Sequence, residues 1–181
     1  MAACRHFSGD RPLTGTGQAI RAQLIVPEQQ ELFDYWRSKA NDGRYPTRAD
    51  IQPAELRRLL PSLSILEVVE GDAPRLKVRL AGTRLRDYLG VEITGHHLDE
   101  YDLGDQTEYW DAAYREVILG GRPAQGVVPL TPWQQPNIFQ FWLRLPLVNG
   151  EGRIVMVLGH DAFMQSEKAH ALAGRANLHI A

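Results

Sequence analysis

Residues 138–148 have the sequence IFQFWLRLPLV, and this stretch says more about the fold than any other. Large apolar side chains occupy alternate positions, namely Phe139, Phe141, Leu143 and Leu145. Gln140, Trp142 and Arg144 fall between them. Because successive side chains of a strand point to opposite faces of a sheet, the alternation predicts a strand with one strongly apolar face. A turn signal at 149–152 and a second apolar run at 153–159 then predict an antiparallel hairpin.

Three further strands are predicted before this hairpin. Leu76, Val78 and Leu80 alternate with charged residues, which is typical of a half-buried strand over 75–81. A short turn joins it to an apolar run that begins near Leu63. Residues 125–130 form another strand, and a loop over 131–137 connects it to the first stretch. Hairpins dominate this order, so we expect a mostly antiparallel sheet of five strands.

Two longer helices accompany the strands. After Pro27, the residues Leu32, Phe33, Trp36 and Ala40 recur at helical spacing. Between 105 and 120 a second helical face contains Trp110, Ala113, Tyr114, Val117 and Ile118. Shorter helices are expected between Pro53 and Pro61 and among the glycines of 82–104. The fold class is therefore α+β, with short helices on one face of the sheet and an added N-terminal helix.

Four segments are expected along the chain. Residues 1–24 form a flexible arm, 25–61 an N-terminal helical segment, 62–162 the core, and 163–181 a polar tail that includes a short helix near 165–175. The 20 basic and 22 acidic residues give a net charge of −2, so neither nucleic acid nor an anionic membrane is an expected partner. The single cysteine, Cys4, excludes an internal disulfide. We expect a cytoplasmic protein without a signal peptide or membrane span.

The sequence predicts no catalytic residues and no metal site. His97 and Glu100 have the spacing to meet on a helical turn, but a solvated surface explains the cluster 96–100 better. The pair His160-Asp161 suggests nucleophilic catalysis only beside a serine or cysteine nucleophile, and the chain has no Gly-x-Ser-x-Gly motif. Gly120-Gly121 follows a helix, whereas the glycines of a phosphate loop lie between a strand and a helix.

The order strand, strand, helices, strand, strand, strand resembles the PAS fold. Several short segments are also similar to a bacterial single-domain PAS family once catalogued as a domain of unknown function. These segments are Tyr35-Trp36, YPTRADIQP (45–53), LLP (59–61), RLAGT (79–83) and LGVEITG (89–95). The resemblance implies a sensory or regulatory role. It also implies that the strands near Ile65 and Met156 pair at the centre of the sheet.

A PAS fold implies a cavity between the sheet and the short helices. Core packing explains the aromatic residues of these elements, and a small-molecule pocket is the alternative. The candidate pocket residues are Tyr88, His97, Trp110, Tyr114, Phe139, Phe141, Trp142 and Met156. No cofactor is identifiable. Haem-binding PAS domains commonly use a histidine on the long helix, which is absent from 106–119, and photoactive flavin domains need a reactive cysteine beside the flavin.

The remaining candidates concern structure and association. We expect Asp50 to cap the short helix that starts at Pro53, and Arg48 to pair with a carboxylate or a carbonyl, with a partner contact as the alternative. The apolar stripe of Leu32, Phe33 and Trp36 is the expected homodimer contact, because many PAS domains pair through such helices.

Three functions stay open. The first is a PAS-type sensory module that binds a small ligand or a protein partner and signals through other proteins. The second is a small isomerase-like or dehydratase-like enzyme with an acid–base pair in the cavity, formed by His97 or His160 and an aspartate. The third is a structural adaptor with a filled core.

Overall fold

The computed structural model describes residues 16–71, 74–101, 103, 106–130 and 137–175. Its strands are β1 (Leu63–Val69), β2 (Arg75–Ala81), β3 (Ala124–Pro129), β4 (Ile138–Val148) and β5 (Ile154–Gln165). Its α-helices are α1 (Thr16–Gln23), α2 (Pro27–Ser38), α3 (Thr83–Leu89), α4 (Thr107–Ile118) and α5 (Ser166–Arg175). Short 3₁₀ helices lie at Arg48–Asp50, Pro53–Leu56, Leu60–Ser62 and Leu98–Glu100. The predicted order of strands and helices is confirmed.

The strands form one antiparallel sheet in the order β2-β1-β5-β4-β3. Strands β1 and β5 pair at the centre, with Ile65 opposite Leu158 and Glu67 opposite Met156. This pairing confirms both the α+β class and the central pair that the PAS resemblance implied.

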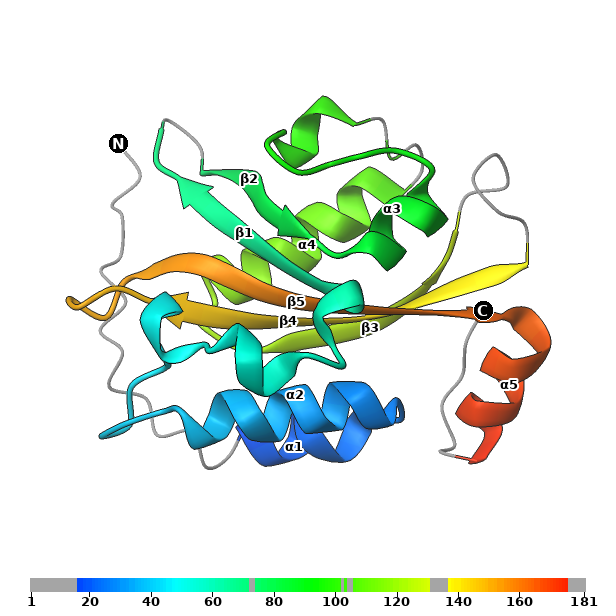
Figure 1. Cartoon of the computed structure of the whole chain (residues 1–181), viewed down its shortest axis with the longest axis horizontal. Coiled ribbons are helices and arrows are strands. Elements are labelled where there is room, and N and C mark those ends of the chain that lie inside the picture. Colours follow the sequence, from blue (N-terminus) through cyan, green and yellow to red (C-terminus); the bar gives the residue numbers. More distant parts are fainter. Residues whose placement is uncertain (1–15, 72–73, 102, 104–105, 131–136, 176–181) are drawn as a thin grey trace.

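Helices cover both faces of the sheet. Helices α1 and α2 lie below it in Figure 1, and α3 and α4 lie above it. Against the lower face, α2 packs on Leu143, Leu145 and Leu147 of β4. Against the upper face, α4 packs on Trp142 and Val157. Every residue of β4 is buried as a result.

The apolar stripe on α2 belongs to the lower core. Leu32, Phe33 and Trp36 are each 0% exposed and pack against β4. The indole Nε1 of Trp36 also donates a hydrogen bond to the carbonyl of Pro146 at 2.9 Å. The prediction that these three side chains make a dimer contact is therefore wrong, because the sheet of the same chain already covers them.

Both ends of the described chain differ from the expected boundaries. Residues 16–23 are helical rather than part of a flexible arm, and Ile20 and Leu24 pack against the lower core. Strand β5 continues past residue 162 because it pairs with β4 as far as Gln165. The short helix expected near 165–175 is confirmed as α5. Residues 1–15, the loop 131–136 and the end of the predicted tail, 176–181, lie outside the described residues.

The outer hairpin contains an irregularity that the alternation did not predict. Leu66 pairs with Val78, whereas Ile65 pairs with Leu80, so the register of β1 and β2 shifts between these positions. The extra residue moves Leu80 to the face opposite Val78. Leu80 is consequently 39% exposed, although its spacing predicted burial beside Val78.

Arg48 and Asp50 have a structural role, but Asp50 caps a different helix from the predicted one. The carboxylate of Asp50 accepts hydrogen bonds from the backbone N–H of Thr47 at 2.8 Å and from its hydroxyl at 2.7 Å. It therefore caps its own turn rather than the helix that starts at Pro53. Arg48 donates to the carbonyl of Ile51 at 3.0 Å, as one of the two predicted pairings requires.

The burial of Trp36 gives a first prediction. Replacing this side chain by alanine leaves a cavity between α2 and β4, so we expect Trp36→Ala to lower the free energy of unfolding by roughly 3–5 kcal/mol. Urea denaturation followed by circular dichroism measures the change. Arg37→Ala on the same helix is exposed and is the control, with an expected effect within about 0.5 kcal/mol. Equal stabilities of the two variants would contradict the placement of Trp36.

Candidate ligand-binding site

A cavity of about 100 Å³ lies between the upper face of the sheet, helices α3 and α4 and the 3₁₀ helix Leu98–Glu100. Apolar side chains make most of its wall, namely Leu66, Val78, Leu85, Leu89, Ile93, Leu98, Leu103 and Leu130. Trp110 and Tyr114 of α4 complete that part of the lining. Polar side chains reach the cavity from the sheet, where Ser64, Gln140 and Arg144 line it, and Gln106 lines it from the start of α4.

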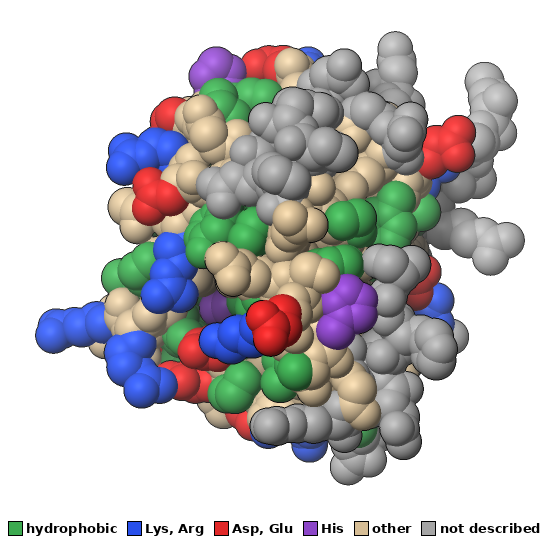
Figure 2. Space-filling model, turned by 90° about the vertical axis from the view of Figure 1, so that its right-hand side faces the viewer, with side chains coloured by type: hydrophobic (Ala, Val, Ile, Leu, Met, Phe, Trp, Pro, Cys, Tyr) green, Lys and Arg blue, Asp and Glu red, His purple; other side chains and the backbone are tan. Residues whose placement is uncertain are grey.

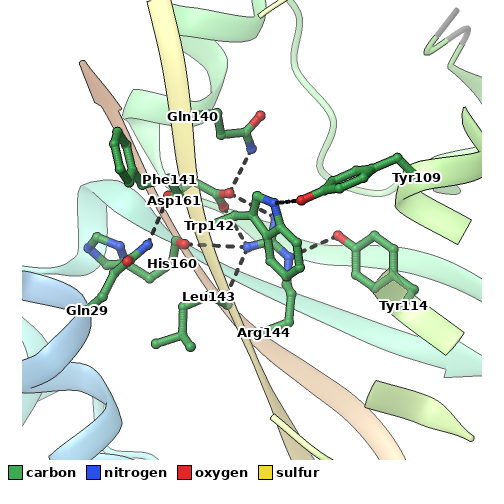
Figure 3. Close-up of polar contacts among 10 residues, drawn as sticks. All are labelled: Gln29, Tyr109, Tyr114, Gln140, Phe141, Trp142, Leu143, Arg144, His160 and Asp161. Carbon is green, nitrogen blue, oxygen red and sulfur yellow. Dashed lines mark hydrogen bonds and ion pairs between the residues drawn. The ribbon is translucent and has the colours of Figure 1, made fainter. Parts of the chain in front are cut away.

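The polar end of the cavity is built on a buried ion pair. Arg144 of β4 and Asp161 of β5 have side chains only 4% and 0% exposed. The guanidinium Nη2 donates to Asp161 Oδ1 at 2.8 Å, and Nη1 donates to Oδ2 at 3.2 Å. Figure 3 shows the two side chains meeting across the neighbouring strands. A bidentate arrangement of this kind joins β4 to β5 by more than their backbone hydrogen bonds.

Neighbouring groups make further hydrogen bonds to the pair. Gln140 Nε2 donates to Asp161 Oδ1 at 2.8 Å. Arg144 Nε donates to the hydroxyl of Tyr114 at 3.1 Å, which ties β4 to α4. Arg144 Nη1 also donates to the carbonyl of Leu143 at 3.0 Å. Such a network is needed because a buried charge is stable only when it is paired and hydrogen-bonded.

Three aromatic rings surround the guanidinium. Its central carbon lies 5.5 Å from the ring centroid of Trp110 and 5.7 Å from those of Tyr114 and Trp142. Cation–π attraction at these distances strengthens when water is excluded. The indole Nε1 of Trp142 donates to the hydroxyl of Tyr109 at 3.0 Å, which fixes the third ring.

Arg144 and Tyr114 keep their protons near neutral pH. Burial disfavours the charged guanidinium, but the adjacent Asp161 and Tyr114 raise the pKa of Arg144 above its usual value. Burial raises the pKa of the Tyr114 phenol. Arg144 therefore stays cationic and Tyr114 stays neutral.

His160 lies on the opposite face of the sheet from its neighbour Asp161. Its side chain is buried toward α2, and its Nδ1 has no hydrogen-bond partner among the described residues. Burial lowers its pKa to about 4, so the ring is neutral at physiological pH. Nearby, Gln29 Nε2 donates to the carbonyl of Phe141 at 2.9 Å (Figure 3). His160 and Asp161 consequently do not form a catalytic pair.

Part of the predicted pocket lies where it was expected. Trp110 and Tyr114 line the cavity. Trp142 packs directly behind them, with its ring centroid 5.3 Å from that of Trp110. Their contact with a ligand stays a prediction.

Phe139, Phe141 and Met156 were wrongly assigned to the cavity. Phe139 and Phe141 pack with Val26 and Ala169, and Met156 packs against the lower core. The reason is the alternation of β4, which turns Gln140, Trp142 and Arg144 toward the cavity and the phenylalanines away from it.

Tyr88 and His97 also lie outside the cavity lining. The ring of Tyr88 stacks on Phe163 with centroids 4.3 Å apart. His97 Nδ1 lies 3.2 Å from Glu100 Oε1, so the predicted meeting of these two residues is confirmed. Their contact is a pair on a helical turn, and within the described ranges no group of three or more His, Cys, Asp or Glu side chains could hold a metal ion.

The sequence reasoning missed Ser64, Gln140, Arg144 and Asp161 as site residues. One signal was available, since an arginine in the middle of an apolar strand requires a buried partner. The partner itself was not predictable from spacing, because Asp161 lies beyond the residue at which the last strand was expected to end.

Among the described residues, every helix is too short or too polar to cross a membrane.

The comparisons with known proteins agree with this geometry. A family model described as a PAS domain matches residues 25–160, from just before α2 to the middle of β5. The chain belongs to the PAS domain family. Members of this family are sensory modules, so this PAS domain is a sensory or regulatory module. No curated protein matches its sequence.

Solved structures similar to this PAS domain share its fold. One, from work with a flavin analogue on a light-oxygen-voltage domain, has a TM-score of 0.52 and 14% identity, with 68% of this chain and 92% of that chain covered. The dark structure of the blue-light photoreceptor Aureochrome1 LOV has a TM-score of 0.50 and 15% identity, covering 67% and 88%. An RNA-binding light-oxygen-voltage receptor has a TM-score of 0.52 and 15% identity, covering 68% of this chain but 36% of that one.

The buried ion pair gives a second prediction. Arg144→Met leaves the carboxylate of Asp161 without its counter-ion, so we expect the free energy of unfolding to fall by roughly 3–5 kcal/mol. The double variant Arg144→Met with Asp161→Leu removes both charges and should recover most of that loss. The control is Arg75→Met, whose pair with Asp99 is exposed to solvent and should contribute little to stability. Arg144→Met with a loss no larger than this control would contradict the argument.

The lowered pKa of His160 gives a third prediction. The unfolded chain takes up a proton at this residue near pH 6.5, whereas the folded chain does so only at about pH 4. Stability should therefore fall as the pH falls between these values. In His160→Leu this contribution is absent, so its loss of stability from pH 7 to pH 4.5 should be smaller by roughly 2–3 kcal/mol. Urea denaturation at both pH values measures the difference, and identical losses in the two proteins would refute it.

Proposed function

We propose that this PAS domain is a small-molecule sensor whose ligand occupies the cavity between the sheet and helices α3 and α4. The observation that supports this function is the cavity itself, an apolar chamber with a few polar groups converging at one end. Small-molecule sites in proteins have this composition, because apolar walls supply affinity and a few polar groups fix the orientation. A structural adaptor would need no such chamber.

The size of the cavity limits the ligand. An engineered protein cavity of about 150 Å³ binds benzene, whereas pockets for drug-sized ligands measure about 300–1,000 Å³. The cavity of about 100 Å³ therefore suits a molecule no larger than a single ring. Flavin and haem are much larger. The sequence supports the same choice, since helix α4 contains no histidine and the strands and helices that line the cavity contain no cysteine.

The protonation states of the residues that line the cavity favour a sensor over an enzyme. Among the described residues that line it, the titratable ones are Tyr114 and Arg144. The pKa of each is raised, so neither exchanges a proton readily near neutral pH. An isomerase or dehydratase needs an acid and a base that converge on its substrate.

The output of the module is proposed to pass to a signalling protein in the cytoplasm, with a homodimer as the functional unit. On the face shown in Figure 2, acidic side chains lie among the basic ones, and the net charge of the chain is −2. This mixture is more typical of a surface that contacts protein than of one that contacts nucleic acid. Because the apolar stripe of α2 is buried against the sheet, a homodimer would have to use a different surface. Sedimentation at several concentrations tests for it.

A variant that fills the cavity tests the proposed function. Leu98 lines the cavity and is partly buried, so Leu98→Trp places a larger side chain in it. We expect the wild-type protein to bind toluene in an NMR titration and to retain a small molecule in native mass spectrometry. The variant should lose both, because the ring of the tryptophan occupies the same volume.

The matched control is Val91→Trp. Val91 is 41% exposed and lies outside the cavity lining, so the same substitution should leave binding unchanged. A wild-type protein that binds no probe, or a Leu98→Trp variant that binds as well as the control, would refute the proposed site.

A further inference from the structure

Ser64 has a hydroxyl group that the fold leaves without a partner. The residue is 3% exposed, and its Oγ makes no hydrogen bond to any described residue. It nevertheless lines the cavity, on β1 opposite Gly159 of β5. A buried hydroxyl without a partner costs free energy, so it points to a group that binds there.

Gly159 creates the space above this hydroxyl. A Cβ atom placed on Gly159 would contact Ser64 Oγ and would lie 3.0 Å from Nη1 of Arg144. Both polar side chains therefore approach the same point over the backbone of β5. Any other residue at position 159 would place a side chain between Ser64 and Arg144. We call the space beside these two side chains the polar corner of the cavity.

The groups around this corner can donate hydrogen bonds. Ser64 has one O–H donor. Arg144 Nη1, the nitrogen nearest Gly159, already donates to Leu143 and Asp161. Nη2 has two N–H donors, of which one is directed to Asp161, and the other has no hydrogen bond among the described residues. Gln140 turns its amide nitrogen toward Asp161 instead. Because Ser64 and Arg144 both line the cavity, these two unused donors favour a ligand atom that accepts hydrogen bonds.

The charges beside Ser64 determine whether an anionic or a neutral acceptor can bind there. The carboxylate of Asp161 balances the guanidinium of Arg144, with which it forms the bidentate pair. An anionic ligand would therefore meet no uncompensated positive charge and would lose its own hydration. A neutral oxygen, such as that of a carbonyl group, has no such penalty. The ring of Trp110 on the cavity wall, together with Leu66 and Val78, suits a flat apolar body.

We propose that Ser64 and Arg144 recognise the carbonyl oxygen of a small, neutral, ring-sized ligand at the corner that Gly159 leaves open. This inference rests on the proposed function and adds the chemical class of the ligand. Ser64 acts as the residue that determines specificity, because its hydroxyl is not required by the fold itself.

A pair of isosteric probes tests the inference. Benzaldehyde has a carbonyl oxygen where styrene has a methylene group, and the two molecules have nearly the same shape. In NMR titrations of the full chain, we expect wild type to bind benzaldehyde about tenfold more tightly than styrene. Benzoate, the anionic analogue, should bind more weakly than benzaldehyde.

The variant Ser64→Ala should remove most of this preference. Its dissociation constant for benzaldehyde should rise about tenfold, while that for styrene should change less than twofold. Its midpoint of urea denaturation should not fall, because the hydroxyl makes no hydrogen bond within the described chain. The control is Ser62→Ala, a buried serine near the start of β1 that lies outside the cavity lining and should keep the tenfold preference.

The possible failures are distinguishable. Equal affinity of wild type for benzaldehyde and styrene, or an unchanged preference in Ser64→Ala, overturns the role of Ser64 and leaves the proposed cavity intact. Tighter binding of benzoate than of benzaldehyde overturns the neutral class of ligand. If neither neutral probe binds to wild type, the inference and the proposed function fail together.

Discussion

Strand β4 is buried on both of its faces along its whole length, and this constraint shapes the rest of the structure. The polar side chains of such a strand cannot reach solvent. Arg144 can therefore exist there only with a counter-ion at hydrogen-bonding distance, and Asp161 on the adjacent strand provides it. The ion pair in turn fixes Gln140 and Tyr114, so one electrostatic requirement organises the polar end of the cavity.

The helices pack differently on the two faces of the sheet. On the lower face, α2 presents a continuous stripe of large side chains, and the leucines of β4 fill the space beneath it. On the upper face, short helices are separated by Gly90 and Gly95, both with positive φ. Short, turning segments cannot cover a sheet as evenly as a longer helix, and the cavity of about 100 Å³ lies under them.

This division gives the module its chemical character. The cavity combines an apolar wall with a neutralised ion pair, and Tyr114 and Arg144 in its lining hold their protons. Such an environment favours binding of a small neutral molecule over proton transfer. Because Arg144 contacts the cavity from β4 while Tyr114 contacts it from α4, a ligand at this place would touch both the sheet and its helical cover. Those are the two layers whose relative position a sensory domain can change.

The sequence by itself determined the α+β class, the number and order of the strands and the helical stripe after Pro27. These features follow from local periodicity, because side-chain direction along a strand or helix is fixed by backbone geometry. The alternation of β4 even separated the two sets of side chains correctly. It did not say which set would face the cavity, and Phe139 and Phe141 were assigned to the wrong side.

Only the tertiary structure decided that question, since it depends on which layer packs on which face. The same is true of the burial of Trp36, which spacing alone could not distinguish from a dimer contact. The pairing of Arg144 with Asp161 and the corner at Ser64 and Gly159 join strands that are distant in sequence. Such contacts are set by strand order and register, which local patterns do not contain.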